Sequence, residues 1–205
     1  MLTHAPMLCS EMGKMDARRS AFVAMLSALG IVLSAISLNI TIGTSTALDL
    51  SHIATFVAAI FGGPIVGATV GLFGGFYAGY YFGFVFGQGL VALVGVPLGK
   101  ALTGFTSGLL YKKLKIGDNP HRSILTIPVT LVSYIPECIF TIVYFLYIVT
   151  LVNGAGMAYI LPLVIPKSWM EIAVMSILMG ALVGNVGFRE FIGRFLRAQT
   201  VRKPM

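Results

Sequence analysis

Apolar residues fall into successive runs along the chain, separated by short polar breaks. A run of about 20 apolar residues can form a helix that crosses a bilayer, where every backbone group has to be paired within its own segment. The pattern therefore predicts six helices, of which the second is short. The predicted segments are Ala21–Ile42, about Leu50–Phe61, Ile65–Phe84, Gly89–Tyr111, Ile124–Val152 and Trp169–Phe188.

The composition also indicates a bilayer environment. The chain is 57% hydrophobic and only 10% charged, with a mean hydropathy of +0.93, which exceeds what a soluble core of this size can hide from water. The first run is too long for a removable signal peptide and lacks a suitable cleavage site. We expect an all-α integral membrane protein, a compact bundle of six transmembrane helices over residues 20–190, between polar tails at 1–19 and 191–205.

Basic residues mark one side of this bundle. The formal net charge is +7, but the cations sit at helix ends, which favours membrane topology and contact with anionic lipid headgroups over nucleic-acid binding. The positive-inside rule then places both termini and the loop between the fourth and fifth helices in the cytoplasm. The exceptions are Lys100, inside a helix, and Lys167, in an expected outer loop. The three clusters are Lys14, Arg18 and Arg19; Lys112, Lys113, Lys115 and Arg122; and Arg189, Arg194, Arg197, Arg202 and Lys203.

Glycine recurs at every fourth position in the third predicted helix and the loop that follows, from Gly63 to Gly87. Small residues let helix backbones approach closely, which is a main source of packing energy between membrane helices. Four residues turn a helix through about 400°, so successive glycines drift by about 40°. We therefore expect the glycines to contact several neighbouring helices rather than a single one.

Two ionisable side chains lie deep in the predicted membrane segments. Lys100 is about 16 Å from the basic end of its helix and Glu137 about 21 Å, at 1.5 Å per residue. A lysine stem can bridge that difference, so the two residues either form a structural ion pair or contact a polar substrate. Pro136 precedes Glu137 and should kink its helix, which suits a binding cavity.

Further polar and aromatic residues gather toward the opposite, outer face. The connection "NITIGTSTALDLSH" is polar, and the last predicted helix opens with "PKSWMEI". Aromatic rings at the outer end of the third helix suit an interfacial belt or stacking on a flat ligand, and Trp169 suits an interfacial anchor as well as a site. The candidate substrate-binding residues are Asn39, Thr44, Asp49, His52, Tyr77, Tyr80, Tyr81, Lys100, Glu137, Tyr144, Trp169 and Glu171.

Asp49, Glu137 and Glu171 make this candidate pocket acidic, partly offset by Lys100. It should therefore favour a ligand with a cationic or hydrogen-bond-donating ring over a dicarboxylate. Known catalytic patterns do not fit. In "GVPLGKA" the first glycine is one position too close to "GK" for a phosphate-binding loop and no Ser or Thr follows the lysine, and the histidines lack metal-ligand spacing. We expect no cofactor, no metal and no enzymatic activity.

Two stretches resemble the substrate-binding S components of energy-coupling factor (ECF) transporters. They are "LDLSHIATFVAAIFGGPIVGATVGLFGGF" and "GVPLGKALTGFTSGLLYKKL". The shared order is a polar loop, a short second helix ending in F-G-P-like residues, a glycine-rich third helix, and a basic residue ahead of spaced glycines. The likeness covers roughly residues 18 to 190, and "FGGP" departs from the more common single glycine.

The resemblance implies a membrane protein of the prokaryotic cell membrane that captures a vitamin or related micronutrient from outside. In that family the loop between helices one and two closes over a pocket formed with helices four to six, and the subunit tilts within the membrane. A transmembrane coupling subunit and two ATPases would drive it. Small residues at A-x-x-x-A spacing form the family's coupling surface, which Ala24 and Ala28 match. The alternatives are a stand-alone small-solute permease or channel, and a membrane enzyme or assembly factor.

Overall fold

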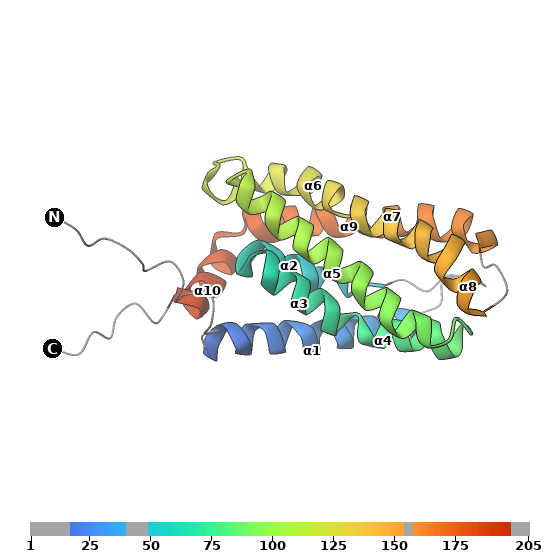
Figure 1. Cartoon of the computed structure of the whole chain (residues 1–205). Coiled ribbons are helices and arrows are strands. Elements are labelled where there is room, and N and C mark those ends of the chain that lie inside the picture. The colour runs from blue at the N-terminus through green and yellow to red at the C-terminus, as the bar shows by residue number, and fades with distance from the viewer. Residues whose placement is uncertain (1–16, 40–48, 154–157, 198–205) are drawn as a thin grey trace, which may run out of the picture.

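The computed structural model describes residues 17–39, 49–153 and 158–197. These residues form an elongated bundle of helices that lie roughly along one axis (Figure 1). The first half contains α1 (Ala17–Asn39), α2 (His52–Gly62), α3 (Pro64–Gly74), α4 (Phe76–Tyr80), the π-helix η1 (Tyr81–Val85) and α5 (Leu90–Lys113).

The second half begins with a 3₁₀ turn, η2 (Ile116–Asp118), and ends with an amphipathic helix. Between them the chain runs through α6 (Arg122–Ser133), α7 (Ile135–Val143), the π-helix η3 (Tyr144–Ile148), α8 (Val149–Asn153), the 3₁₀ turn η4 (Ala158–Ile160), α9 (Leu161–Gly184) and α10 (Val186–Arg197). The start of α1, the hairpin between α5 and α6, and α10 lie at the same end of the bundle (Figure 1). The basic clusters in the described residues therefore share that end, which we call the basic end.

Five stretches of helix are long and apolar enough to cross a membrane: 17–39, 64–85, 90–113, 122–152 and 158–184. They correspond to five of the six predicted segments. The remaining one, α2, has 11 residues and is about 16 Å long, roughly half of a 30 Å hydrocarbon core. A sharp turn joins it to α3, because Gly63 adopts a φ of 90° and Pro64 starts the next helix.

Two predicted boundaries were wrong. The last long helix begins at Leu161 rather than Trp169, because Pro162 lies in its first turn, where a missing N–H costs nothing. Lys167, expected in an outer loop, lies within this helix and pairs with Glu171 one turn later, at 3.3 Å between Nζ and Oε1. The same helix ends at Gly184 rather than Phe188, and the chain continues as α10 to Arg197, which includes the first residues of the segment expected as a polar tail.

The break at Pro136 follows its prediction. α6 ends at Ser133 and α7 begins at Ile135, with Tyr134 between them. Proline has no N–H to donate to the preceding turn, so the ladder of hydrogen bonds is interrupted where Glu137 enters the bundle.

The glycine repeat packs mainly against α5, and of its members only Gly67 also meets a second helix, α2, where a Cβ would lie 2.6 Å from Ala59 Cβ, so fewer helices share the contact than we expected. A Cβ on Gly67, Gly71 or Gly79 would meet backbone atoms of Gly104, Lys100 or Ala92 within 2.9 Å. Gly75 and Gly83 meet Pro97 and Gly89 in the same way. Glycines later in the repeat meet residues earlier in α5, so the two segments run antiparallel. Their contacts repeat every four residues, which is more than the 3.6 residues of one helical turn, so the two segments wind about each other. The wider π turn of η1 takes up part of the remaining drift.

Candidate functional site

A cavity of about 480 Å³ lies in the half of the bundle away from the basic end. It exists because α2 is short. α2 begins at His52 in the middle of the bundle, with Asp49 just before it. The space beyond these two residues is left to side chains from the first half of α5, α7, η3 and the start of α9. Residues from η1 and η4 complete the wall.

Lys100 binds the segment that leads into α2. It is only 2% exposed, and its ammonium donates hydrogen bonds to Asp49 Oδ2 and Ser51 Oγ. Asp49 Oδ1 accepts a further bond of 3.0 Å from the Ser51 backbone N–H. Burial works to raise the pKa of Asp49, but the Lys100 charge and these hydrogen bonds together hold it well below its usual value. Asp49 is therefore a carboxylate throughout the physiological pH range.

Glu137 forms a second group of polar contacts in the cavity, with side chains of α2 and α5. Its Oε2 accepts a hydrogen bond of 2.9 Å from His52 Nε2 and one of 2.5 Å from the hydroxyl of Thr103. The carboxylate lies over Gly99, where a Cβ would come within 3.3 Å of its Cγ. Within the described residues, the structure shows no hydrogen bond to Glu137 Oε1.

Glu171 supplies the third carboxylate. Its Oε1 accepts a hydrogen bond of 3.0 Å from the Asp49 backbone N–H and pairs with Lys167. Residues 49–52 are thus attached to α5, α7 and α9 through Lys100, Glu137 and Glu171 respectively. Three separate helices fix the inner end of the connection between α1 and α2.

Aromatic rings form the rest of the cavity. The Tyr144 ring rests on α5 at Gly95, where a Cβ would lie 2.4 Å from Cε2, and it stacks with Phe140 at 6.2 Å between centroids. Its hydroxyl donates to Gln88 Oε1 at 3.4 Å. Tyr144 and Phe145 belong to η3, while Phe82 belongs to η1, so both π-helical turns face the cavity. Such turns are frequent at functional sites.

Half of the predicted substrate-binding residues come together here. Those that line the cavity are Asp49, His52, Lys100, Glu137, Tyr144 and Glu171. The expected alternative of a direct Lys100–Glu137 ion pair was wrong, because Lys100 takes Asp49 as its partner and Glu137 takes His52. From the sequence we paired the two charged residues deepest in the long helices with each other. Their actual partners lie at the start of the short α2: Asp49 just before it and His52 as its first residue.

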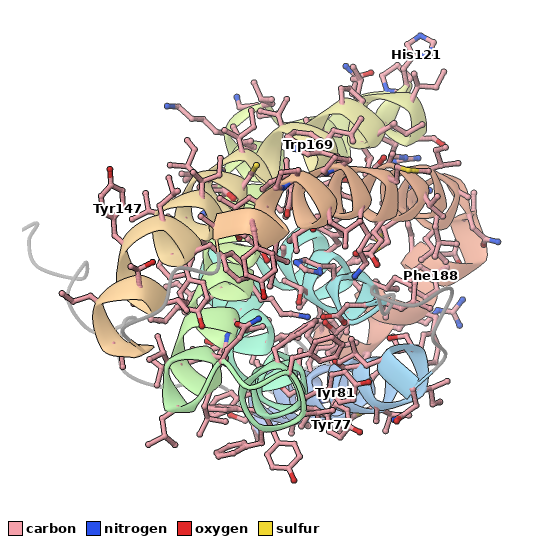
Figure 2. The ribbon with its side chains drawn as sticks, turned by 90° about the vertical axis from the view of Figure 1, so that its right-hand side faces the viewer. Tyr77, Tyr81, His121, Tyr147, Trp169 and Phe188 are labelled. Atoms are coloured by element: carbon pink, nitrogen blue, oxygen red, sulfur yellow. The ribbon has the colours of Figure 1, made fainter. Side chains whose placement is uncertain are left out.

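The other predicted residues lie elsewhere. Tyr77 accepts a hydrogen bond of 3.2 Å from the side chain of Asn39, and Tyr81 lies beside it near α1, on the side of the molecule opposite Trp169 (Figure 2). Tyr80 is 53% exposed. Trp169 packs edge-on against Tyr134, at 5.4 Å between centroids, and so supports a ring that lines the cavity.

Ala24 and Ala28 lie on the exposed face of α1, as a coupling surface requires, and Thr44 lies outside the described residues. Several residues that complete the site were not predicted from the sequence: Ser51, Gln88, Thr103, Phe140 and Lys167. Thr103 and Lys167 could have been found, since each is three or four residues along its helix from a selected charged residue and so shares its face.

These features define a class of protein: a helical, multi-pass membrane protein with an internal cavity lined by charged and aromatic residues. Among the described residues, no cluster of three or more His, Cys, Asp or Glu side chains is placed to hold a metal ion. The family model of the ECF transporter, substrate-specific component, matches residues 18–183. The chain therefore belongs to that family, which confirms the resemblance seen in the sequence, and it is a transport-specificity subunit rather than an enzyme. No curated protein and no solved structure gave a match in the corresponding comparisons.

Proposed function

We propose that this S component captures a vitamin or related micronutrient from outside a prokaryotic cell, in the cavity between α2, α5, α7 and α9. The observation that carries the proposal is the position of this polar cavity, away from the basic end of the bundle. By the positive-inside rule the basic end faces the cytoplasm, so the cavity lies toward the outer side. Its volume of about 480 Å³ is within the range of small-molecule sites.

The charges of the cavity favour a neutral or singly cationic ligand. Lys100 and Lys167 are each paired with a carboxylate, and Glu137 is paired with His52. A ligand carboxylate would have to displace one of these partners, at the cost of leaving a buried anion. Ligand N–H or O–H donors, in contrast, have Glu137 Oε1 as an acceptor, and the rings of Phe140 and Tyr144 offer a flat apolar surface.

The proposed transport step follows from membership of the family. The six segments, including α2, form the membrane bundle with both termini in the cytoplasm. A transmembrane coupling subunit binds the small-residue face of α1 at Ala24 and Ala28, and two ATPases drive a tilt of the bundle that carries the ligand inward. Support comes from the exposure of both alanines and from the anchoring of residues 49–52 to three helices, which lets the bundle move as a unit.

Mass spectrometry of the purified protein tests the capture step. Protein prepared from cells grown in rich medium should carry a small aromatic molecule that dissociates on denaturation, with micromolar or tighter affinity. Micromolar binding requires only about 8 kcal/mol, within reach of one stacked ring and a few buried hydrogen bonds. Glu137→Gln protein should lose the molecule, whereas Glu190→Gln, which removes an exposed carboxylate on α10, should retain it.

Reconstituted vesicles distinguish the proposal from a stand-alone permease or channel. Vesicles that contain this chain alone should not accumulate the identified ligand, and addition of the coupling subunit, both ATPases and ATP should start accumulation. Equilibration of the ligand by the chain alone would instead assign it to the permease class.

A further inference from the structure

A second, apolar hollow of about 440 Å³ lies at the basic end of the bundle, between α5 and α6. Its walls are Leu110 and Leu114 of α5, Ile116 of η2, and Leu125, Val129 and Val132 of α6. The hollow is separate from the substrate cavity, with which it shares no lining residue.

The hollow extends along about two thirds of the thickness of one leaflet. From Leu125 to Val132 it follows α6 for about 10 Å, against about 15 Å for half of the hydrocarbon core. Leu114 and Val132 are 60% and 50% exposed, so the surface is open to the side on which a bilayer would lie. Part of an apolar acyl chain can therefore enter the hollow from the bilayer.

Three basic residues belong to the segments that form the interfacial end of the hollow, and the guanidinium of one of them, Arg122, donates a hydrogen bond of 3.2 Å to the Gly117 carbonyl. Lys113 and Lys115 are exposed and stand directly beside Leu114, while Arg122 begins the helix that forms the other wall. Asp118 is the sole carboxylate between Tyr111 and Ile124. An apolar slot topped by several cations is complementary to one kind of molecule, a lipid with an anionic headgroup.

The backbone at Lys115 adds an independent observation. Its φ of 49° places it in the left-handed region, just after α5 ends, and among the described residues it is the one non-glycine with positive φ. Glycine or asparagine usually occupies this position, because a side chain there strains the backbone. This turn places Lys115 between Leu114 and Ile116, both of which line the hollow.

We propose that the hollow between α5 and α6 binds one anionic phospholipid, with an acyl chain between Leu114 and Val132 and the phosphate at Lys113, Lys115 and Arg122. The lipid anchors the α5–α6 hairpin in the leaflet at the basic end. The site is independent of the substrate that the other cavity takes.

Native mass spectrometry of the full chain tests this proposal. The protein is released from nanodiscs of phosphatidylcholine with one fifth phosphatidylglycerol, and retained lipids are counted. Wild-type protein should keep one phosphatidylglycerol in preference to phosphatidylcholine. Each basic residue at an anionic surface raises affinity about fivefold, so Lys113→Gln with Lys115→Gln should reduce retention more than tenfold. The matched control, Arg19→Gln with Arg194→Gln, should keep it.

A second pair of variants tests the apolar part. Val132→Trp places a ring in the hollow from an exposed position and should exclude the lipid without disturbing folding, whereas Val174→Trp, on an exposed part of α9, should not. Equal retention in the lysine double variant and its control, or in the two tryptophan variants, would overturn the proposal. A photo-crosslinker at position 132 should label lipid in intact membranes, and labelling of a protein chain would overturn it as well.

Discussion

The two faces of α5 use glycine in different ways. Toward α3, the backbone at Lys100 and Gly104 meets that of Gly71 and Gly67 with no room for a methyl group. Toward α7, the space above Gly95 and Gly99 holds the side chains of Tyr144, Phe140 and Glu137, and beyond them the cavity. One face excludes side chains and forms a rigid seam, while the other receives them and forms a site.

The tight seam makes the cavity possible. In a membrane, the hydrophobic effect contributes little to contact between helices, so association depends on close packing. Helices that surround a cavity lose part of that packing, and close backbone contact at the seam can compensate for the loss. α5 belongs to both regions, and the stem of Lys100 extends from the seam to the site. Substitutions in the seam should therefore affect folding, whereas those at the cavity should affect binding first.

The largest effect is expected in the seam, from Gly71→Leu. A Cβ there would lie 2.5 Å from the Lys100 carbonyl oxygen, and backbone cannot move aside as a side chain can. The cost should exceed the roughly 1–3 kcal/mol of ordinary overpacking. We expect little folded protein on size-exclusion chromatography, whereas Gly193→Leu on α10, where a Cβ meets nothing within 4 Å, should fold. A folded Gly71→Leu protein that had lost only its ligand would assign the seam to the site.

Lys100→Met should have the next largest effect. It leaves Asp49 buried without its cation, and removal of one partner from a buried pair costs roughly 3–5 kcal/mol. In the wild type the pKa of Asp49 lies below its unfolded value, so its contribution to stability is present above about pH 4 and is lost only in stronger acid.

Without Lys100, only His52 and the Ser51 N–H oppose the effect of burial, and we expect the pKa of Asp49 to rise above that of the unfolded chain. The protonated form then favours the folded state, so the variant should be more stable at pH 5 than at pH 8. Thermal unfolding of both proteins across this range measures the difference. If the difference in melting temperature between variant and wild type were the same at pH 5 and pH 8, the assignment of Lys100 as the partner of Asp49 would be contradicted.

Glu137→Gln should change binding more than folding. The amide keeps the shape of the side chain and can still accept the Thr103 hydroxyl, but it loses the charge-assisted bonds, worth about 1.5–3 kcal/mol each. We expect a loss of affinity of tenfold or more by isothermal titration with the identified ligand. Equal affinity together with poor expression would indicate that Glu137 acts only in the structure.

Gly95→Ala should give the smallest effect and defines the size of the site. The methyl group would displace the Tyr144 ring from its place on α5 and push it into the cavity. Because a ring can turn aside, we expect a folded protein with a severalfold lower affinity for the native ligand and less loss for a smaller analogue. If Gly95→Ala instead prevented folding, the two faces of α5 would not differ as described.

The sequence by itself determined the class of fold, because apolar runs of membrane length and the placement of basic residues at helix ends follow from the properties of a bilayer. It also determined the family, through the order of its motifs. It also selected Lys100 and Glu137 as candidate site residues, since a charge deep in a membrane helix needs a partner or a function.

Only the tertiary structure decided which partners those residues take. His52 and Glu137 are 85 positions apart, and Lys100 and Asp49 are 51 apart, so no local spacing encodes either contact. The sequence also left undecided which helix the glycines contact. Glycines at every fourth position drift around a straight helix, and they face mainly one neighbour only when the two segments wind about each other. Distant pairing and helix crossing are properties of the assembled bundle, whereas membrane length, charge and small size are properties that each residue already has in the chain.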